Sequence, residues 1–187
     1  MGDDLIGLAR GLAAERLTDV PRRWDHVRGV AEEAARIAPR IAPADSEAIV
    51  AAAWLHDIGY APTIAATGFH PVDGAAFARV NGLPELVVSL IAHHTGADAE
   101  AAERGLVAAL GEFAPPPSDV LDVVTFADLT TSPDGGPVSA EDRVAEILSR
   151  YGPQDPVHAA VSRSAPELLA SVARVYERLD LAPSVSA

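Results

Sequence analysis

Apolar residues recur along this chain at intervals of three, four and seven positions, and that spacing places them on one face of an α-helix. The pattern predicts helices near residues 3–17, 22–38, 46–57, 70–80, 84–94, 99–111, 118–131, 139–150 and 157–180. No segment has the convincing alternation of apolar and polar residues that indicates a half-buried strand. The sequence therefore predicts an all-α fold.

Turn-forming residues separate the predicted helices. Pro39 and Pro43 punctuate the turn after the second helix, and Gly59 can end the third. The proline-rich stretch 114–118 predicts a stiff connector, and the stretch 132–137 predicts a turn-rich loop. This loop could be a lid with mobile glycines, but an ordinary turn is the favoured interpretation.

Ionisable residues interrupt the core-facing stripes of several predicted helices. His26, for example, shares a stripe with Val30 and Ile37. An unpaired ion buried there would cost several kcal/mol, and a bound metal supplies the counter-charge. Each residue alone is compatible with a hydrogen-bonded core position or a helix cap, whereas the set together favours a metal site. The set comprises His26, His56, Asp57, His70, His93, His94 and Asp128.

Composition limits the chemistry of such a site. The chain has no cysteine, so neither a disulfide framework nor a thiolate metal site is possible. All 14 basic residues are arginine, which excludes Schiff-base chemistry and a lysine-dependent phosphate loop. Imidazole and carboxylate ligands suit iron, manganese, nickel, cobalt, zinc or magnesium.

Charge and hydropathy bear on partners and location. The formal net charge of -13 argues against a nucleic-acid surface or an anionic membrane as the main partner. The first residues lack the pattern of a secretory signal, and the longest apolar run, residues 48–55, is too short to cross a bilayer. We expect a cytoplasmic protein, monomeric or homodimeric, that acts on a small molecule.

The spacing of the histidines and aspartates resembles the HD-domain superfamily of metal-dependent phosphohydrolases. The family pattern is a histidine, a His-Asp pair and a distant aspartate, here His26, His56-Asp57 and Asp128. Members with two metals insert two further histidines, and His70 and His94 resemble these. The resemblance extends from about residue 22 to residue 131.

This resemblance implies an all-helical bundle whose central helices converge on a dinuclear site with two divalent ions. His26, His56, Asp57 and Asp128 would surround one metal. His70 and His94, together with Asp57 as a bridging ligand, would surround the second. It also implies a single domain over residues 1–187, with the metal-site core at about 22–131 and the helices of 139–180 packed on it.

The implied reaction is hydrolysis of a phosphate ester of a nucleotide or another small phosphorylated metabolite. Two metals can hold and deprotonate a bridging water, so His56 and Asp57 are the expected catalytic centre. Arg23 is the first candidate for substrate binding, because residues 23–26 resemble a motif in dinucleoside polyphosphate hydrolases of this superfamily. Arg143 and His93 are further candidates, the latter as a substrate contact or a hydrogen-bonded neighbour of the ligands.

One departure keeps other functions open. Many hydrolytic members carry a lysine soon after the His-Asp pair, whereas this chain has Tyr60 there. A mixed-valent di-iron oxygenase that cleaves a carbon–phosphorus or carbon–carbon bond is the first alternative, because its ligand set is similar. A nucleotide-binding module without turnover is the second.

Overall fold

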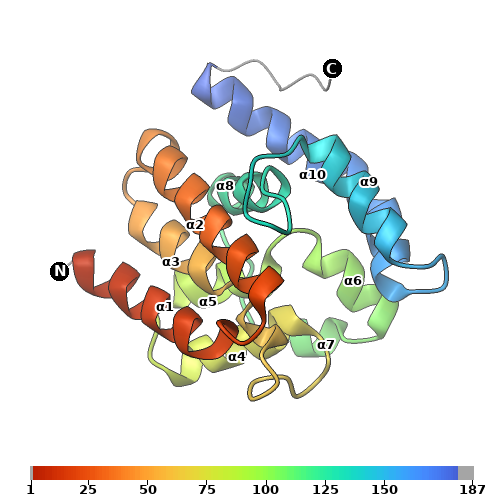
Figure 1. The fold of residues 1–187 in the computed structure, drawn as a ribbon, viewed down its shortest axis with the longest axis horizontal. Helices are drawn as coiled ribbons and strands as arrows, with labels where there is room; N and C mark the ends of the chain where they lie inside the picture. Colours follow the sequence, from red (N-terminus) through yellow and green to blue (C-terminus); the bar gives the residue numbers. More distant parts are fainter. Residues whose placement is uncertain (1, 181–187) are drawn as a thin grey trace.

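The computed structural model describes residues 2–180, with the side chains of residues 5–180, and within this part the chain forms helices and no strands. The predicted all-α fold is confirmed. Ten α-helices and one 3-10 helix follow one another along the chain (Figure 1). They are α1 (Gly2–Leu17), α2 (Pro21–Ile41), α3 (Ser46–Leu55), η1 (Ile58–Tyr60), α4 (His70–Val80), α5 (Glu85–His93), α6 (Ala97–Arg104), α7 (Val107–Leu110), α8 (Ser118–Leu129), α9 (Ala140–Arg150) and α10 (Pro156–Leu179). None of the described helices is long and apolar enough to span a membrane.

Helix α3 occupies the centre of the fold. It carries small and aliphatic residues on all sides, a composition typical of a helix surrounded by others, and it packs against α1, α2, α5 and α8. Its buried residues are Ile49, Val50, Ala51, Ala52, Ala53 and Leu55. The short alanine side chains allow neighbouring helices to approach closely. The residues that follow the end of α3 therefore lie in the interior of the fold.

The two C-terminal helices lie together on one side of the molecule, opposite α1, α2 and α3 (Figure 1). Helix α10 packs on α6, α8 and α9 and buries Leu168, Val172 and Val175. Arg174 on α10 donates two hydrogen bonds of 2.8 Å to Asp122 on α8. The apolar face of the terminal helix is thus buried within this chain.

Several predicted boundaries are wrong, each for a local reason. Helix α2 continues through Pro39 to Ile41, because the apolar stripe that buries Ile37 continues to the end of the helix. The predicted helix 99–111 is two helices, α6 and α7, because Gly105 adopts a left-handed φ of 69° between them. Helix α3 ends at Leu55, so the His-Asp pair lies beyond it.

Gly59 has a different role from the predicted helix end. It lies in η1, where a Cβ atom would be 2.1 Å from the carbonyl oxygen of His70 and 2.8 Å from the backbone nitrogen of Gly74. Only glycine permits this approach between η1 and α4. The contact brings the segment after α3 against the first turn of α4.

We expect Gly59→Ala to lower the free energy of unfolding by about 1–3 kcal/mol or more, because the clash is with backbone atoms that cannot rotate away. Gly11→Ala in α1 is the matched control, since a Cβ there meets nothing within 4 Å. The control should raise stability by about 0.5–1 kcal/mol. Urea denaturation of both variants checks this, and equal effects would contradict the proposed packing role.

Candidate metal centre

Five segments of the fold converge on one cluster of histidine and aspartate side chains. Each of these side chains comes from the beginning or the end of a helix, or from a residue directly after one. The cluster consists of His26 on α2, His56 and Asp57 after α3, His70 at the start of α4, His94 directly after α5 and Asp128 near the end of α8. These six are the side chains that the sequence predicted as metal ligands, and the structure brings all of them together.

The cluster divides into two groups of three, and in each group the ligand atoms lie within 4.8 Å of one another. The first contains His26, His56 and Asp128, and Oδ1 of Asp128 is 3.0 Å from Nε2 of His26 and 4.0 Å from Nε2 of His56. The second contains Asp57, His70 and His94. Two ligands about 2.1 Å from one ion are separated by about 3.0–3.4 Å. Both groups are therefore close to the dimensions of a metal site.

Asp57 lies between the two groups. Its Oδ2 is 3.5 Å from Nε2 of His56 and 4.0 Å from Nε2 of His26, in the first group. Its Oδ1 is 3.4 Å from Nε2 of His70 and 4.0 Å from Nε2 of His94, in the second. Each carboxylate oxygen thus faces a different group, as a bridging ligand requires.

Backbone carbonyl groups set the orientation of three of the imidazole rings. Each of these rings donates its Nδ1–H to a carbonyl oxygen, which turns Nε2 toward the cluster, where the neutral ring can offer it to a metal. The pairs are His26 with Ser132 at 3.0 Å, His56 with Ala53 at 2.8 Å and His94 with Ile91 at 2.7 Å. Histidine ligands of metals are commonly held in this way.

The imidazole nitrogens that face the cluster have few hydrogen-bond partners other than one another and the carboxylates. Among the described residues, buried Nε2 of His56 has no hydrogen-bond partner. Nε2 of His70 and Nε2 of His94 face each other at 3.1 Å. Burial lowers the pKa of both His56 and His70, so neutral rings are favoured. Neutral imidazole nitrogens that approach one another and two carboxylates would all gain from a cation placed between them. Nitrogen and oxygen donors of this kind suit a divalent metal.

Both carboxylates of the cluster are held in the charged form. Burial opposes the charge, but Arg23 and the neighbouring histidines lower the pKa of Asp57 well below its usual value. Burial also opposes the charge on Asp128, but the neighbouring His26, His56 and Arg143 outweigh it and lower the pKa of Asp128. Two anionic oxygen ligands are thus available near neutral pH.

Arg23 and Tyr60 form one wall of the site. Arg23 donates a hydrogen bond of 2.5 Å to Oδ2 of Asp57, and its guanidinium lies 4.0 Å from the centre of the Tyr60 ring. Tyr60 in turn stacks on His70, with ring centres 4.0 Å apart and planes tilted by 18°. The tyrosine at the position where many relatives have lysine therefore orients an arginine and a histidine of the cluster.

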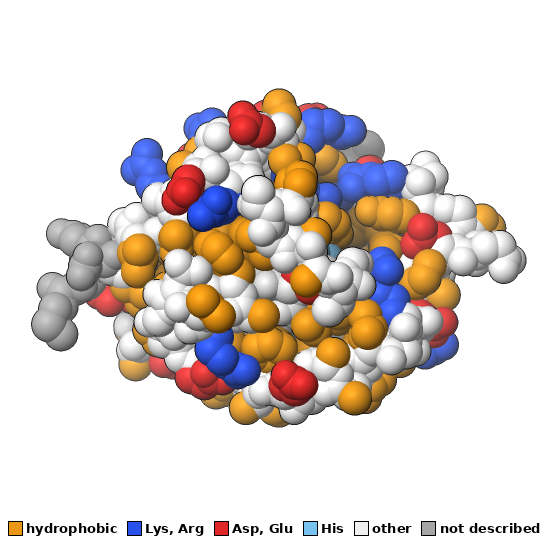
Figure 2. All heavy atoms as spheres, turned by 90° about the horizontal axis from the view of Figure 1, so that it is seen from below, with side chains coloured by type: hydrophobic (Ala, Val, Ile, Leu, Met, Phe, Trp, Pro, Cys, Tyr) orange, Lys and Arg blue, Asp and Glu red, His pale blue; other side chains and the backbone are white. Residues whose placement is uncertain are grey.

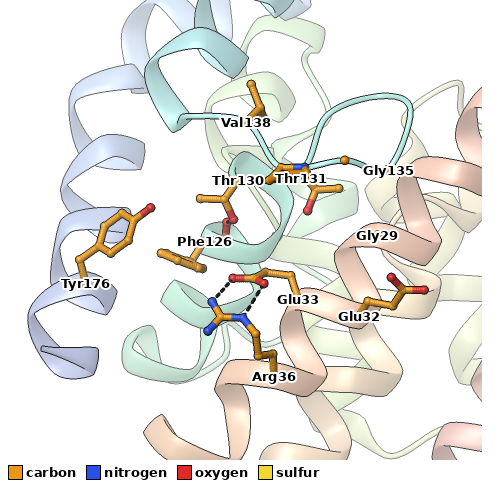
Figure 3. Close-up of a pocket in the computed structure, with 12 residues that line it drawn as sticks. Gly29, Glu32, Glu33, Arg36, Phe126, Thr130, Thr131, Gly135, Val138 and Tyr176 are labelled. Carbon is orange, nitrogen blue, oxygen red and sulfur yellow. Dashed lines mark hydrogen bonds and ion pairs between the residues drawn. The ribbon is translucent and has the colours of Figure 1, made fainter. Parts of the chain in front are cut away.

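The loop after α8 packs on α2 and orients one histidine of the cluster. The chain turns back at Gly135, whose φ is 82° and where a Cβ atom would lie 2.5 Å from the carbonyl oxygen of Asp25. This seats the loop on α2, where the Ser132 carbonyl accepts the hydrogen bond from His26. A cavity of about 570 Å³ lies between this loop, α2, α8 and α10 (Figure 3). The predicted turn-rich loop thus packs as a turn that orients a histidine.

A cavity opens over the two groups of ligands. Its walls come from α2, the segment after α3, η1, α4, the segment after α5, α6, α8, α9 and α10. Figure 2 shows a hollow in which a histidine side chain is visible, with arginine side chains beside it. Besides five of the six ligands, the lining contains Arg23, Tyr60, Thr95, Glu100, Arg143, Ile147, Arg150, Tyr151, Val157 and Val161.

The two other predicted substrate contacts differ in position. Arg143 on α9 lines the cavity, and its side chain is buried. His93 does not belong to the lining: its Nε2 lies 3.0 Å from the carbonyl oxygen of Phe113, and its Nδ1 lies 3.4 Å from Oδ2 of Asp98. Burial opposes a charge on His93, but these two acceptors raise its pKa. The structure therefore gives His93 partners outside the cluster.

Thr95 is a residue of the cavity that sequence reasoning missed. Its φ of 34° lies in the left-handed region, which is strained for a β-branched side chain. Its hydroxyl oxygen is buried and has no hydrogen-bond partner among the described residues, and the side chain lines the cavity. The only signal in the sequence is its place directly after the predicted ligand His94.

Comparison with known proteins agrees with this geometry. The family model described as HD domain matches residues 23–132, which is more than half of the chain and contains all six residues of the cluster. No curated protein and no solved structure gives a significant match. The resemblance deduced from the His and Asp spacing is confirmed, and the chain belongs to the HD domain family.

Proposed function

We propose that this protein is a metal-dependent phosphohydrolase that cleaves a phosphate ester of a nucleotide or another small phosphorylated metabolite. One observation carries the proposal: two groups of ligands share the carboxylate of Asp57 on the floor of a cavity whose walls hold arginines. Arginine binds phosphoryl oxygens through its planar fork of donors. Family membership supports the same class of reaction.

In this proposal His26, His56 and Asp128 hold one divalent ion, His70 and His94 hold a second, and Asp57 contacts both. Bound divalent ions supply Lewis acidity to phosphoryl oxygens and make water a better nucleophile. The nitrogen and oxygen donors are compatible with iron or manganese, and with nickel, cobalt, zinc or magnesium.

The arginines supply positive charge where negative charge develops on the phosphoryl group. Arg23 is held by Asp57 and Tyr60, so its guanidinium is oriented before substrate arrives. Arg143 is only 5 % exposed, and its Nε donates to no described protein atom. Fixed donors in a site that excludes water stabilise a transition state more than mobile ones do.

Metal content tests the ligand assignment. We expect about two ions per wild-type chain and about one in His94→Ala, because only the second group loses a ligand. At about 100 times its Kd, added metal should raise the free energy of unfolding by about 2.7 kcal/mol. Plasma mass spectrometry and thermal denaturation measure these quantities.

The adjacent histidine is the matched control for this test. His93→Gln should keep the wild-type metal content, because both ring nitrogens of His93 face partners outside the cluster. Equal metal loss in His93→Gln and His94→Ala would contradict the assignment. Iron in the purified protein, with oxygen consumed in the presence of substrate, would instead favour the di-iron oxygenase alternative.

Phosphate release tests the reaction itself. With p-nitrophenyl phosphate and a panel of nucleotides, the metal-loaded protein should release phosphate, and Asp57→Asn should reduce kcat/KM by at least about 100-fold. Asp122→Asn is the control, because Asp122 is a buried aspartate that pairs with Arg174 instead of the cluster. It should lower stability and keep the activity of the folded fraction. No release from any substrate would count against hydrolysis.

Thr95 is proposed to donate a hydrogen bond to the substrate. A strained conformation persists where the surrounding structure holds it, and such positions are concentrated at functional sites. Here the strain directs a buried, unpartnered hydroxyl toward the cavity. The hydroxyl can donate to a phosphoryl oxygen without first breaking another protein hydrogen bond.

We expect Thr95→Gly to raise the free energy of unfolding by about 0.5–1 kcal/mol, because glycine relieves the strain of a left-handed φ. The same variant should lose about 10-fold or more in kcat/KM, the effect of one hydrogen bond to a charged group. Thr95→Ser keeps the hydroxyl and should retain most activity. Denaturation and steady-state kinetics separate the two effects, and unchanged activity in the glycine variant would refute the role.

A further inference from the structure

A second cavity adjoins the metal centre and collects arginine side chains. It measures about 300 Å³ and continues the cavity over the ligands, with which it shares Arg23, His26, Arg143, Arg150 and Tyr151; Val20, Arg22 and Pro133 line it alone. None of the described residues that line it is acidic, although the chain carries a net charge of -13. The lining residues are Val20, Arg22, Arg23, His26, Pro133, Arg143, Arg150 and Tyr151. Arg22 pairs with Asp134, Arg23 with Asp57, and Arg143 and Arg150 with Glu146, so one positive charge remains beyond these three carboxylates and favours an anion.

Helix α9 arranges two of these arginines as a pair. Glu146 lies between them in sequence, with Arg143 Nη1 2.5 Å from its Oε2 and Arg150 Nε 2.9 Å from its Oε1. One carboxylate therefore holds two guanidinium groups, so the pair keeps a net positive charge. Arg143 also retains a buried Nε that no described protein atom accepts from.

The arginine pair on α9 lies outside the part of the chain that the family model matches. The family match ends at residue 132, whereas α9 spans Ala140–Arg150. Arg143, Arg150 and Tyr151 thus lie outside the region that the family model matches. A substrate that reached from the metal centre into the second cavity would contact these residues.

We propose that the substrate carries two phosphoryl groups, one bound at the metal centre and the other in the cavity lined by Arg22, Arg143 and Arg150. The inference rests on the proposed function and specifies its substrate class. Four guanidinium groups line the cavity and pair with three carboxylates. Donors such as the buried Nε of Arg143 remain for the oxygens of a phosphoryl group. The volume suits part of a small molecule.

The cavity of about 570 Å³ between α2, α8 and α10 differs in charge. It holds one arginine, Arg36, which donates hydrogen bonds of 2.9 and 2.6 Å to Glu33 (Figure 3). Glu32 also lines it, so acidic residues outnumber basic ones. Arg36 nevertheless resembles Arg150, because each is paired with a glutamate on its own helix. It is a matched control for an arginine substitution.

The test measures binding of propane-1,3-diphosphonate and of propylphosphonate to the metal-loaded full chain by calorimetry. We expect the wild type to bind the diphosphonate at least about 10-fold more tightly. Arg150→Gln should reduce diphosphonate affinity by about 10-fold and change propylphosphonate affinity by less than about two-fold. Arg36→Gln should change neither affinity.

Arg22→Gln is a second variant of the cavity, at an exposed position where the side chain pairs with Asp134 at 3.5 Å, and it should act in the same direction as Arg150→Gln. Equal loss of both ligands in Arg150→Gln, no loss in either cavity variant, or a loss in Arg36→Gln would overturn the inference.

Hydrolysis of p-nitrophenyl phosphate by the same preparations distinguishes this inference from the proposed function. If phosphate is released but diphosphonate binding does not depend on Arg150 or Arg22, the two-phosphoryl site is refuted and the hydrolase stands. If diphosphonate binding depends on both arginines and no phosphate is released from any substrate, the anion site stands and hydrolysis fails.

Discussion

A carboxylate buried among imidazole rings, that of Asp57, is the group on which the rest of the site depends. Its two oxygens face different pairs of histidines, and Arg23 alone among the nearby groups brings it a permanent positive charge. A buried polar group without a partner costs about 1–3 kcal/mol, and an ion costs more. A bound cation satisfies the carboxylates and the inward-facing nitrogens together. The five segments that meet here are thereby linked through one electrostatic requirement.

Much of this arrangement was predictable because it is local in sequence. Helical periodicity located the helices, and the interruption of apolar stripes by ionisable residues singled out His26 and Asp128. The His56-Asp57 pair was predicted for the wrong reason. The pair falls within the predicted helix 46–57, but α3 ends at Leu55 and the pair lies in the turn that leads to η1.

What the sequence did not reveal depends on contacts between distant segments. The approach of Gly59 to the backbone of His70 joins two helices, and a glycine there reads equally well as a helix end. The position of α9 beside the ligands also depends on tertiary contacts. Arg143 and Arg150 are seven residues apart and thus share a helical face, but nothing in that spacing says which surface the face meets. The strain at Thr95 is a property of the folded backbone alone.

The distribution of charge decides how an anionic substrate could be recognised. A net charge of -13 repels an anion at long range, yet repulsion between exposed charges is screened beyond about 8 Å at physiological ionic strength. Within that distance, the four arginines of the second cavity have three carboxylate partners, Asp57, Asp134 and Glu146, so the guanidinium charges exceed those of their partners by one. Binding of an anionic substrate would then depend on short-range contacts, because long-range electrostatic attraction would not guide it to the site. A ligand must enter the cavity to gain them, so shape and the position of its phosphoryl groups would contribute more to selection than its total charge.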